Sequence, residues 1–215
     1  MNNPKVSILL FFKEDRGWLQ NARDSVYSQD YDGEIQLIQS DKVNPLHKTM
    51  NASENLNALL PFVKGKYVKY LCEDDMLTSI CVRESVEAME EQGSDALHGN
   101  AINRFVTNKG YSDKLYQPKI LMPDVKSIKK GNYIHGGTLF YKSSLFLEEG
   151  YCFDESLDCA EEMDLNLKLL TDGKSFGYVN KYLYIYRRHN TQKSLGGDVD
   201  QTARAKRIQA IYDRY

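Results

Sequence analysis

Three consecutive carboxylates, Glu73-Asp74-Asp75, follow a short run of strand-forming residues from Tyr67 to Cys72. Tyrosine, valine and leucine favour a pleated, half-buried surface and carboxylates do not, so we predict a strand that ends at about Cys72. In open α/β folds, ligands bind at the carboxyl ends of the strands, where these acids would lie. Three adjacent acids repel one another. A hard cation such as Mg²⁺ or Mn²⁺, which takes oxygen ligands and often phosphates, would neutralise them.

The same acids have a second explanation. A helix is predicted from Thr78 to Glu91, and either Asp75 or Thr78 could simply cap its N-terminus. This segment alone leaves both explanations open.

A second group of acids, Glu161, Glu162 and Asp164, opens another predicted helix that runs to Thr171. Carboxylates in a first helical turn interact favourably with the helix dipole and need no chemistry. A carboxylate that faces a substrate could instead accept a proton as a general base. From the residues alone, the dipole explanation is favoured.

The composition is that of an ordinary globular protein. The chain has 215 residues, of which 41% are hydrophobic and 27% charged, enough for one sizeable domain, with two small ones possible. The net charge of −2 gives no electrostatic case for binding nucleic acid or an anionic membrane. The apolar run near the N-terminus is too short to span a bilayer, so we expect no transmembrane segment. The four cysteines lack zinc-site spacing, which predicts reduced thiols and a cytoplasmic location.

Strands and helices alternate in the first part of the chain, which predicts an α/β sheet with right-handed crossovers. The predicted elements are a strand over 6–12, a helix over 16–28, a strand over 34–39, a helix over 53–63, a strand over 67–72 and a helix over 78–91. Ser53 or Asn51 is expected to cap the second helix. Pro61 is expected to shorten or kink it, because proline cannot continue the backbone hydrogen bonding of a helix.

The second part of the chain is less regular. Residues 107–133 are rich in Lys, Pro, Asp and Gly, and we interpret them as a hairpin or a loop over the site. The remaining predicted elements are strands over 96–106, 133–141, 175–179 and 182–186, helices over 143–148 and 161–171, and a basic amphipathic helix from Asp200 onward. The basic helix would present a solvated face or contact a following domain or partner.

Four stretches, in order along nearly the whole chain, resemble family 2 glycosyltransferases, enzymes with the GT-A fold. The first stretch is Trp18-Leu19 with Ala22, Ser25-Val26, Gln29 and Tyr31. The second is Lys64 to Tyr67 with Leu71 and Glu73 to Asp75, which is similar to the approach to a metal-binding DxD site. The third is Gly150 with Phe153 to Glu155 and Glu161 to Leu165, and the fourth is Tyr186 to His189 with Ser194. The length and character are also similar to those of a glycosyltransferase domain from a chlorella virus.

The resemblance implies a single GT-A domain over residues 1–215, with a mixed, mostly parallel central sheet flanked by helices. Residues 1–106 would bind the nucleotide-sugar, and residues 107–215 would form the acceptor side and the C-terminal helix. The implied activity is an inverting, metal-dependent transfer of a hexose from a UDP-sugar donor to a hydroxyl of a saccharide or glycan acceptor, with Mn²⁺ or Mg²⁺ as cofactor. A non-catalytic nucleotide-sugar or glycan-binding module is the alternative. A nucleotidyltransferase ranks low, because the loop after the first strand has only Gly17.

The resemblance also implies roles for individual residues. Asp75, Glu73 and His189 would be metal ligands. His189 is equally a candidate phosphate contact, and an ordinary surface or strand-end histidine explains it as well as either role. Glu162 would be the catalytic base, with Glu161 as the neighbour that could be confused with it. The implied nucleotide-sugar contacts are Phe12, Lys13, Asp41, Asn57, Glu73, Asp74, Arg187 and Arg188, with Lys193 as a further cation near the diphosphate. His135-Gly136-Gly137 would either admit the acceptor close to the backbone or form an ordinary turn.

The chain departs from the family pattern at three places. Phe11 to Glu14 replaces the usual Pro-Thr-Tyr-Asn, which leaves backbone rather than side-chain contacts to the base. The pair before Lys64-Gly65 that is usually Arg-Asn is Leu56-Asn57, so a phosphate-binding or uracil-binding arginine is missing. The implied base Glu162 is one methylene longer than the usual aspartate, which shifts the place where the acceptor hydroxyl must lie.

Overall fold

The computed structural model describes residues 3–131, 134–190, 192 and 201–215. Tyr133, at which a strand is predicted to begin, lies outside the described residues, as do Lys193 and Ser194.

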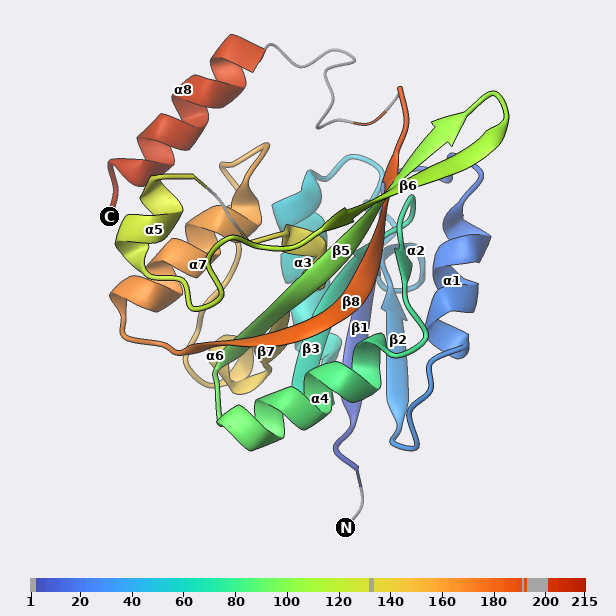
Figure 1. Ribbon diagram of the computed structural model, residues 1–215, viewed down its shortest axis with the longest axis horizontal. Coiled ribbons are helices and arrows are strands. Elements are labelled where there is room, and N and C mark those ends of the chain that lie inside the picture. Colours follow the sequence, from blue (N-terminus) through green and yellow to red (C-terminus); the bar gives the residue numbers. More distant parts are fainter. Residues whose placement is uncertain (1–2, 132–133, 191, 193–200) are drawn as a thin grey trace.

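The centre of the protein is one mixed sheet with the strand order β2-β1-β3-β7-β5-β8-β4, and β6 pairs with β5 (Figure 1). The strands are β1 (Val6–Phe11), β2 (Ile35–Gln39), β3 (Tyr67–Cys72), β4 (Met76–Leu77), β5 (Ala96–Thr107), β6 (Gly110–Tyr116), β7 (Phe140–Lys142) and β8 (Phe176–Arg188). Strand β1 is parallel to both β2 and β3, and β5 is parallel to β8. The antiparallel β7 joins these two parallel groups.

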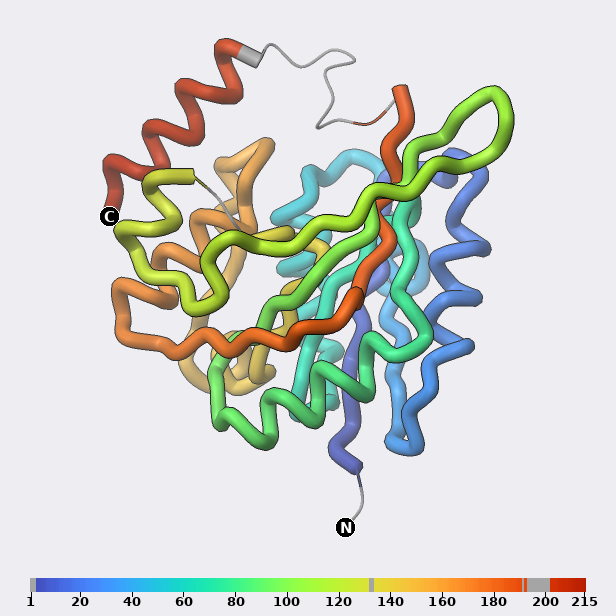
Figure 2. The backbone as a smooth tube through the Cα atoms, in the orientation of Figure 1, coloured from blue at the N-terminus to red at the C-terminus, as the bar shows by residue number. Residues whose placement is uncertain are grey.

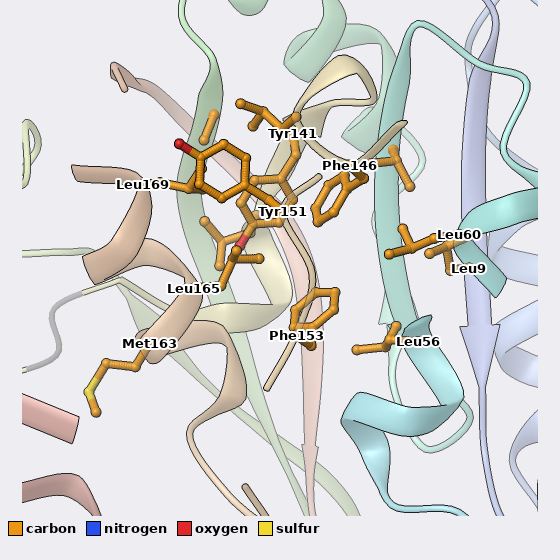
Figure 3. Packing of buried hydrophobic residues seen from close by; sticks show 14 of the residues in the cluster. Leu9, Leu56, Leu60, Tyr141, Phe146, Tyr151, Phe153, Met163, Leu165 and Leu169 are labelled. Atoms are coloured by element: carbon orange, nitrogen blue, oxygen red, sulfur yellow. The ribbon is translucent and has the colours of Figure 1, made fainter. Parts of the chain in front are cut away.

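Helices cover both faces of this sheet, because the strands carry apolar side chains on both sides. One face packs against α1 (Leu19–Tyr27) and α4 (Cys81–Gln92). The opposite face packs against α3 (Ala52–Leu59), α6 (Ser144–Leu147) and α7 (Glu161–Thr171). Figure 3 shows this second core, in which side chains from α3, α6 and α7 meet residues of β1 and β7. The short helices α2 (Ser40–Val43) and α5 (Val125–Lys129) and the C-terminal α8 (Gln201–Tyr212) complete the fold.

Two predicted helices are shorter than expected, for local reasons. The first begins at Leu19 rather than at Arg16, because Asp15 Oδ1 accepts the backbone N–H groups of Gly17 and Leu19 and holds the preceding residues in a turn. The second ends at Leu59, and a single 3₁₀ turn over Leu60–Phe62 contains Pro61, as its missing N–H predicts. Of the two predicted caps, Asn51 is correct, because it forms a capping box with Glu54.

Three predictions of strands and helices are corrected by pairing over long distances. The predicted strands 175–179 and 182–186 are one strand, β8, with a register shift against β5 near Asn100. The helix predicted from Thr78 begins at Cys81, because Met76 and Leu77 pair with β8 instead. The strand predicted over 133–141 is divided into a 3₁₀ turn over Gly136–Thr138 and the short β7.

Of the segment predicted as a hairpin or loop over 107–133, the first part forms a hairpin, whereas Val125–Lys129 forms the helix α5, which was not predicted. Strand β6 folds back on β5, and the pair projects beyond the body of the sheet (Figure 2). No helix in the described part of the chain combines the length and apolar character needed to cross a membrane.

We predict that the core around α7 dominates stability. Replacing the fully buried Leu167 with alanine should lower the free energy of unfolding by about 3 kcal/mol, because it leaves a cavity as well as losing buried apolar surface. Leu147→Ala is the matched control: its side chain is 48% exposed, and the change should cost under about 0.5 kcal/mol. Urea unfolding of the three proteins measures both values, and equal midpoints for the two variants would contradict the packing described.

Candidate functional site

A pocket of about 780 Å³ opens at the carboxyl ends of β1 and β3. Its walls include both acidic groups, Glu73 to Asp75 after β3 and Glu161-Glu162 at the start of α7. Other lining residues come from the segment after β1, from the 3₁₀ turn before β7, from β8 and from α8: Phe12, Lys13, Arg16, His135, Gly136, Gly137, Tyr184, Tyr186, Arg188 and Arg204. The fold therefore brings together two carboxylate clusters that are almost ninety residues apart in the sequence.

Asp75 is buried and fixed by groups from β8. Its Oδ2 accepts the Tyr184 hydroxyl at 2.8 Å, and its Oδ1 accepts the Arg187 backbone N–H at 2.7 Å. Burial, followed by repulsion from Asp74, raises the pKa of Asp75 well above its usual range. Neither Asp75 nor Thr78 caps α4, whose N-cap residue is Ile80. The capping explanation of the acids is therefore wrong.

Arg16 provides the positive charge next to the other two acids. Its Nε donates to Glu73 Oε1 at 2.6 Å and its Nη2 to Asp74 Oδ2 at 2.9 Å. The Nε2 atom of His189 lies 3.2 Å from the same Asp74 oxygen. Burial raises the pKa of Glu73 even though Arg16 lowers it. The sequence interpretation overlooked Arg16; the available signal was its place in the polar loop after the first strand, at the sheet edge where the acids were expected.

Cys72 and the three acids Glu73, Asp74 and Asp75, called the acidic corner below, suit a divalent cation. Cys72, Asp74 and Asp75 each offer one ligand atom, and these atoms lie within 4.8 Å of one another. Each Asp75 oxygen keeps a lone pair beyond its one hydrogen bond, and the guanidinium of Arg16 shows that the corner attracts positive charge. Carboxylate oxygens match Mg²⁺ or Mn²⁺, whereas the sulfur is a softer ligand. Glu73 is turned to Arg16, and His189 contacts Asp74 rather than joining this group.

Glu162 also lines the pocket, in the first turn of α7. The residue before the helix, Ala160, has φ 61°, the left-handed region that few non-glycine residues adopt. Burial, with a smaller contribution from Glu161, raises the pKa of Glu162 to about 7. A carboxylate with a pKa near neutral is suited to take and release a proton. The third acid of this turn, Asp164, instead pairs with Arg214 at 3.0 Å.

The predicted nucleotide contacts divide into two sets. Phe12, Lys13 and Arg188 line the pocket, and the Phe12 N–H donates to Ser40 Oγ. Asp41 and Asn57 are not among the described residues that line the pocket. Asp41, in α2, instead lies 3.4 Å from Lys42 Nζ and 3.9 Å from the Arg23 guanidinium.

Asn57 and Arg187 serve the packing around the pocket. The Asn57 side chain donates to Phe153 O at 2.8 Å and accepts the Phe153 N–H at 3.0 Å, which ties α3 to the loop before α7. The Arg187 side chain is buried, with its guanidinium 4.9 Å from the centre of the Trp18 ring. Burial lowers the pKa of Arg187.

Comparisons with known proteins identify the fold. No family model matches the sequence, and no curated protein matches it either. Residues 1–349 of S. aureus TarS in complex with UDP-GlcNAc superpose with a TM-score of 0.68 at 14% identity, over 98% of this chain and 65% of that one. The UDP complex of the same protein superposes with a TM-score of 0.63 at 14% identity, over 100% of this chain and 71% of that one.

This chain thus spans about 65% of the length of the first of these structures. The likeness confirms the predicted GT-A fold, a mixed, mostly parallel sheet flanked by helices. Its bacterial source lends no support to the predicted viral origin.

We predict that Arg16 stabilises the acidic corner. Arg16→Gln leaves two buried carboxylates without their cation, so the free energy of unfolding at pH 7 should fall by about 3 kcal/mol. Without Arg16 the pKa of Glu73 rises further above its unfolded value, so the folded state holds a proton that the unfolded state releases. The loss should therefore grow as the pH rises from 5 to 7.

Urea unfolding at both pH values measures this difference. Arg23→Gln is the control, because Arg23 donates to Gln39 Oε1 at 2.7 Å, lies 3.9 Å from Asp41 and does not line the pocket. A loss for Arg16→Gln that is the same at pH 5 and pH 7 would show that the carboxylates do not depend on Arg16.

Proposed function

We propose that this chain is an inverting, metal-dependent glycosyltransferase that moves a hexose from a UDP-sugar to a hydroxyl of a saccharide or glycan acceptor. The observation that carries the proposal is that one pocket holds a cation-attracting corner on one wall and a carboxylate with a pKa of about 7 on another. The GT-A fold and the binding of UDP-GlcNAc and UDP by the similar TarS structures support the choice of donor.

Inversion requires an in-line displacement. The acceptor oxygen forms a bond to the anomeric carbon while the bond from that carbon to the diphosphate oxygen breaks on the opposite face. The acceptor proton passes to Glu162, and UDP leaves with the electron pair of the broken bond. Glu162 performs this step as the carboxylate, and its raised pKa makes it a stronger base than an ordinary glutamate.

The donor side of the pocket must hold a diphosphate among acids. Asp75 and Asp74, with Cys72 beside them, would hold Mn²⁺ or Mg²⁺. The bound cation would neutralise the charge that builds up on the leaving diphosphate. Arg188 lines the same pocket and offers a guanidinium to the phosphates, and Phe12 and Lys13 lie at the end of β1 where the base and ribose would bind.

The first test is release of UDP from a panel of UDP-sugars with saccharide acceptors, with and without Mn²⁺. We expect turnover that depends on the cation. Asp75→Asn should abolish the Mn²⁺-dependent gain in UDP affinity, because an amide is a weaker ligand than a carboxylate. Asp113→Asn, in the exposed β5–β6 hairpin, is the control and should behave as the natural protein. UDP binding without turnover by any donor would leave a non-catalytic nucleotide-sugar-binding module.

A second test concerns Glu162. Because the base acts deprotonated, kcat/KM should rise with pH through an apparent pKa of about 7 and level off above it. Glu162→Gln should lower kcat by at least about 10²-fold while leaving UDP affinity unchanged, since general-base catalysis contributes that much. Transfer by Glu162→Gln at the original rate would remove Glu162 from this role, and the same experiment on Glu161→Gln would then identify the base.

A further inference from the structure

Lys69 lies in the middle of β3, and its side chain, which ends in an ammonium group, is not exposed to solvent. Strand β3 lies between β1 and β7, and Lys69 pairs with Ile8 of β1. Burial lowers the pKa of Lys69 to about 8. Among the described residues, no carboxylate lies within 4.0 Å of its Nζ. A buried charge of this kind is costly unless hydrogen bonds compensate for the lost water.

The compensating groups are backbone carbonyls of the segment that leads into β7. Lys69 Nζ donates to Gly137 O at 2.5 Å and to Leu139 O at 3.3 Å. The ladder between β3 and β7 stops at the pair Val68–Tyr141, so these carbonyls lie beyond the last strand partner. Buried carbonyls require hydrogen-bond donors, and the Lys69 ammonium provides them for Gly137 and Leu139. The Tyr70 hydroxyl donates in the same way to Gly136 O at 2.7 Å.

The segment held in this way lies between the two walls of the pocket. A Cβ on Gly136 would lie 2.9 Å from Cγ of Glu162 and 3.0 Å from its Oε1. A Cβ on Gly137 would lie 2.2 Å from Cε1 of Tyr184, the residue whose hydroxyl donates to Asp75. The backbone of these two glycines thus touches the Glu162 side chain on one side and the Tyr184–Asp75 pair on the other.

We propose that Lys69 is a positioning residue, which holds the Gly136–Gly137 backbone in place and so sets the position of Glu162 relative to Asp75. The expected effect on catalysis rests on the proposed function, whereas the placement of Glu162 through the Gly136–Gly137 backbone does not. Transfer in line requires the base and the leaving-group site to keep a defined separation, and displacements near 1 Å cost about 10²-fold in rate. Neither carboxylate lies within 4.0 Å of Lys69 Nζ. The Lys69 charge acts on Asp75 from further away but is not among the charges acting on Glu162, so its effect on Glu162 passes through the glycine segment.

The test is Lys69→Met, which keeps a linear side chain of similar length and removes the donors. We expect kcat to fall about 10²-fold with the affinity for UDP changed by less than about threefold, because only the base is displaced. Lys142→Met is the matched control. Lys142 also donates to a backbone carbonyl, that of Gly93 at 3.0 Å, but it does not line the pocket, and its loss should leave kcat unchanged.

A second readout does not depend on activity. Carbon-13 NMR titration of the Glu162 carboxyl, assigned with Glu162→Gln, should give a pKa near 7 in the natural protein and about one unit lower in Lys69→Met. Burial is the main cause of the raised pKa, and a loosened Gly136 lets water reach the carboxylate. The charged groups acting on Glu162 are Glu161 and Arg204, so loss of the Lys69 charge does not itself produce the shift.

An unchanged Glu162 titration in folded Lys69→Met would overturn the proposal, whether or not the natural protein transfers sugar. If Lys69→Met does not fold, Gly136→Ala tests the same placement with Lys69 intact, because the added methyl presses directly on Glu162. We expect that variant to lose kcat and keep UDP affinity. An unchanged kcat and an unchanged Glu162 titration in Gly136→Ala would equally overturn the proposal. A natural protein without turnover, but with the expected titration shifts, would reject the proposed function and keep the inference.

Discussion

Three buried carboxylates at the end of β3 repel one another, and the groups that compensate for this repulsion come from distant parts of the chain. Arg16 reaches Glu73 and Asp74 from the loop after β1. The Tyr184 hydroxyl and the Arg187 N–H reach Asp75 from β8. The short β4 pairs with β8 directly after the acids, which places Asp75 against that strand. The acidic corner is therefore stable only where β1, β3 and β8 are correctly assembled, and the same assembly creates the pocket.

The two carboxylate groups of the pocket have different surroundings, and this separates their roles. Burial raises the pKa of Asp75 too, but the two hydrogen bonds that it accepts act against this shift and favour its charged form, and Asp74 faces a guanidinium. At Glu162, burial raises the pKa to about 7. When two carboxylates of one site lie in different environments, one can act as an electrostatic group and the other as a proton acceptor. The Gly136–Gly137 backbone, to which Lys69 donates, lies between Glu162 and Tyr184. The relative position of the two carboxylate groups therefore depends on the packing of the sheet.

The departures from the family pattern acquire a physical meaning in the structure. The polar loop after β1 lacks the expected motif but provides Arg16 at the acidic corner. Asn57, which keeps one position of the expected pair, ties α3 to the loop before α7 instead of lining the pocket. The fold is shared with TarS at 14% identity, so the architecture tolerates nearly complete replacement of its side chains. What the pocket does is consequently decided by a small number of polar residues.

Local sequence was sufficient for most of the fold, because apolar periodicity and breaking residues act over a few positions. It predicted that β3 ends at Cys72, that α7 runs over Glu161–Thr171 and that Pro61 shortens α3. It also pointed to both acidic groups. Only the tertiary structure decided which groups face them, since Asp75 and Arg187 are 112 positions apart and meet through strand pairing. The continuous β8, the contact of Arg16 with the acids and the burial that raises the pKa of Glu162 all follow from packing between distant segments, and no local pattern records that packing.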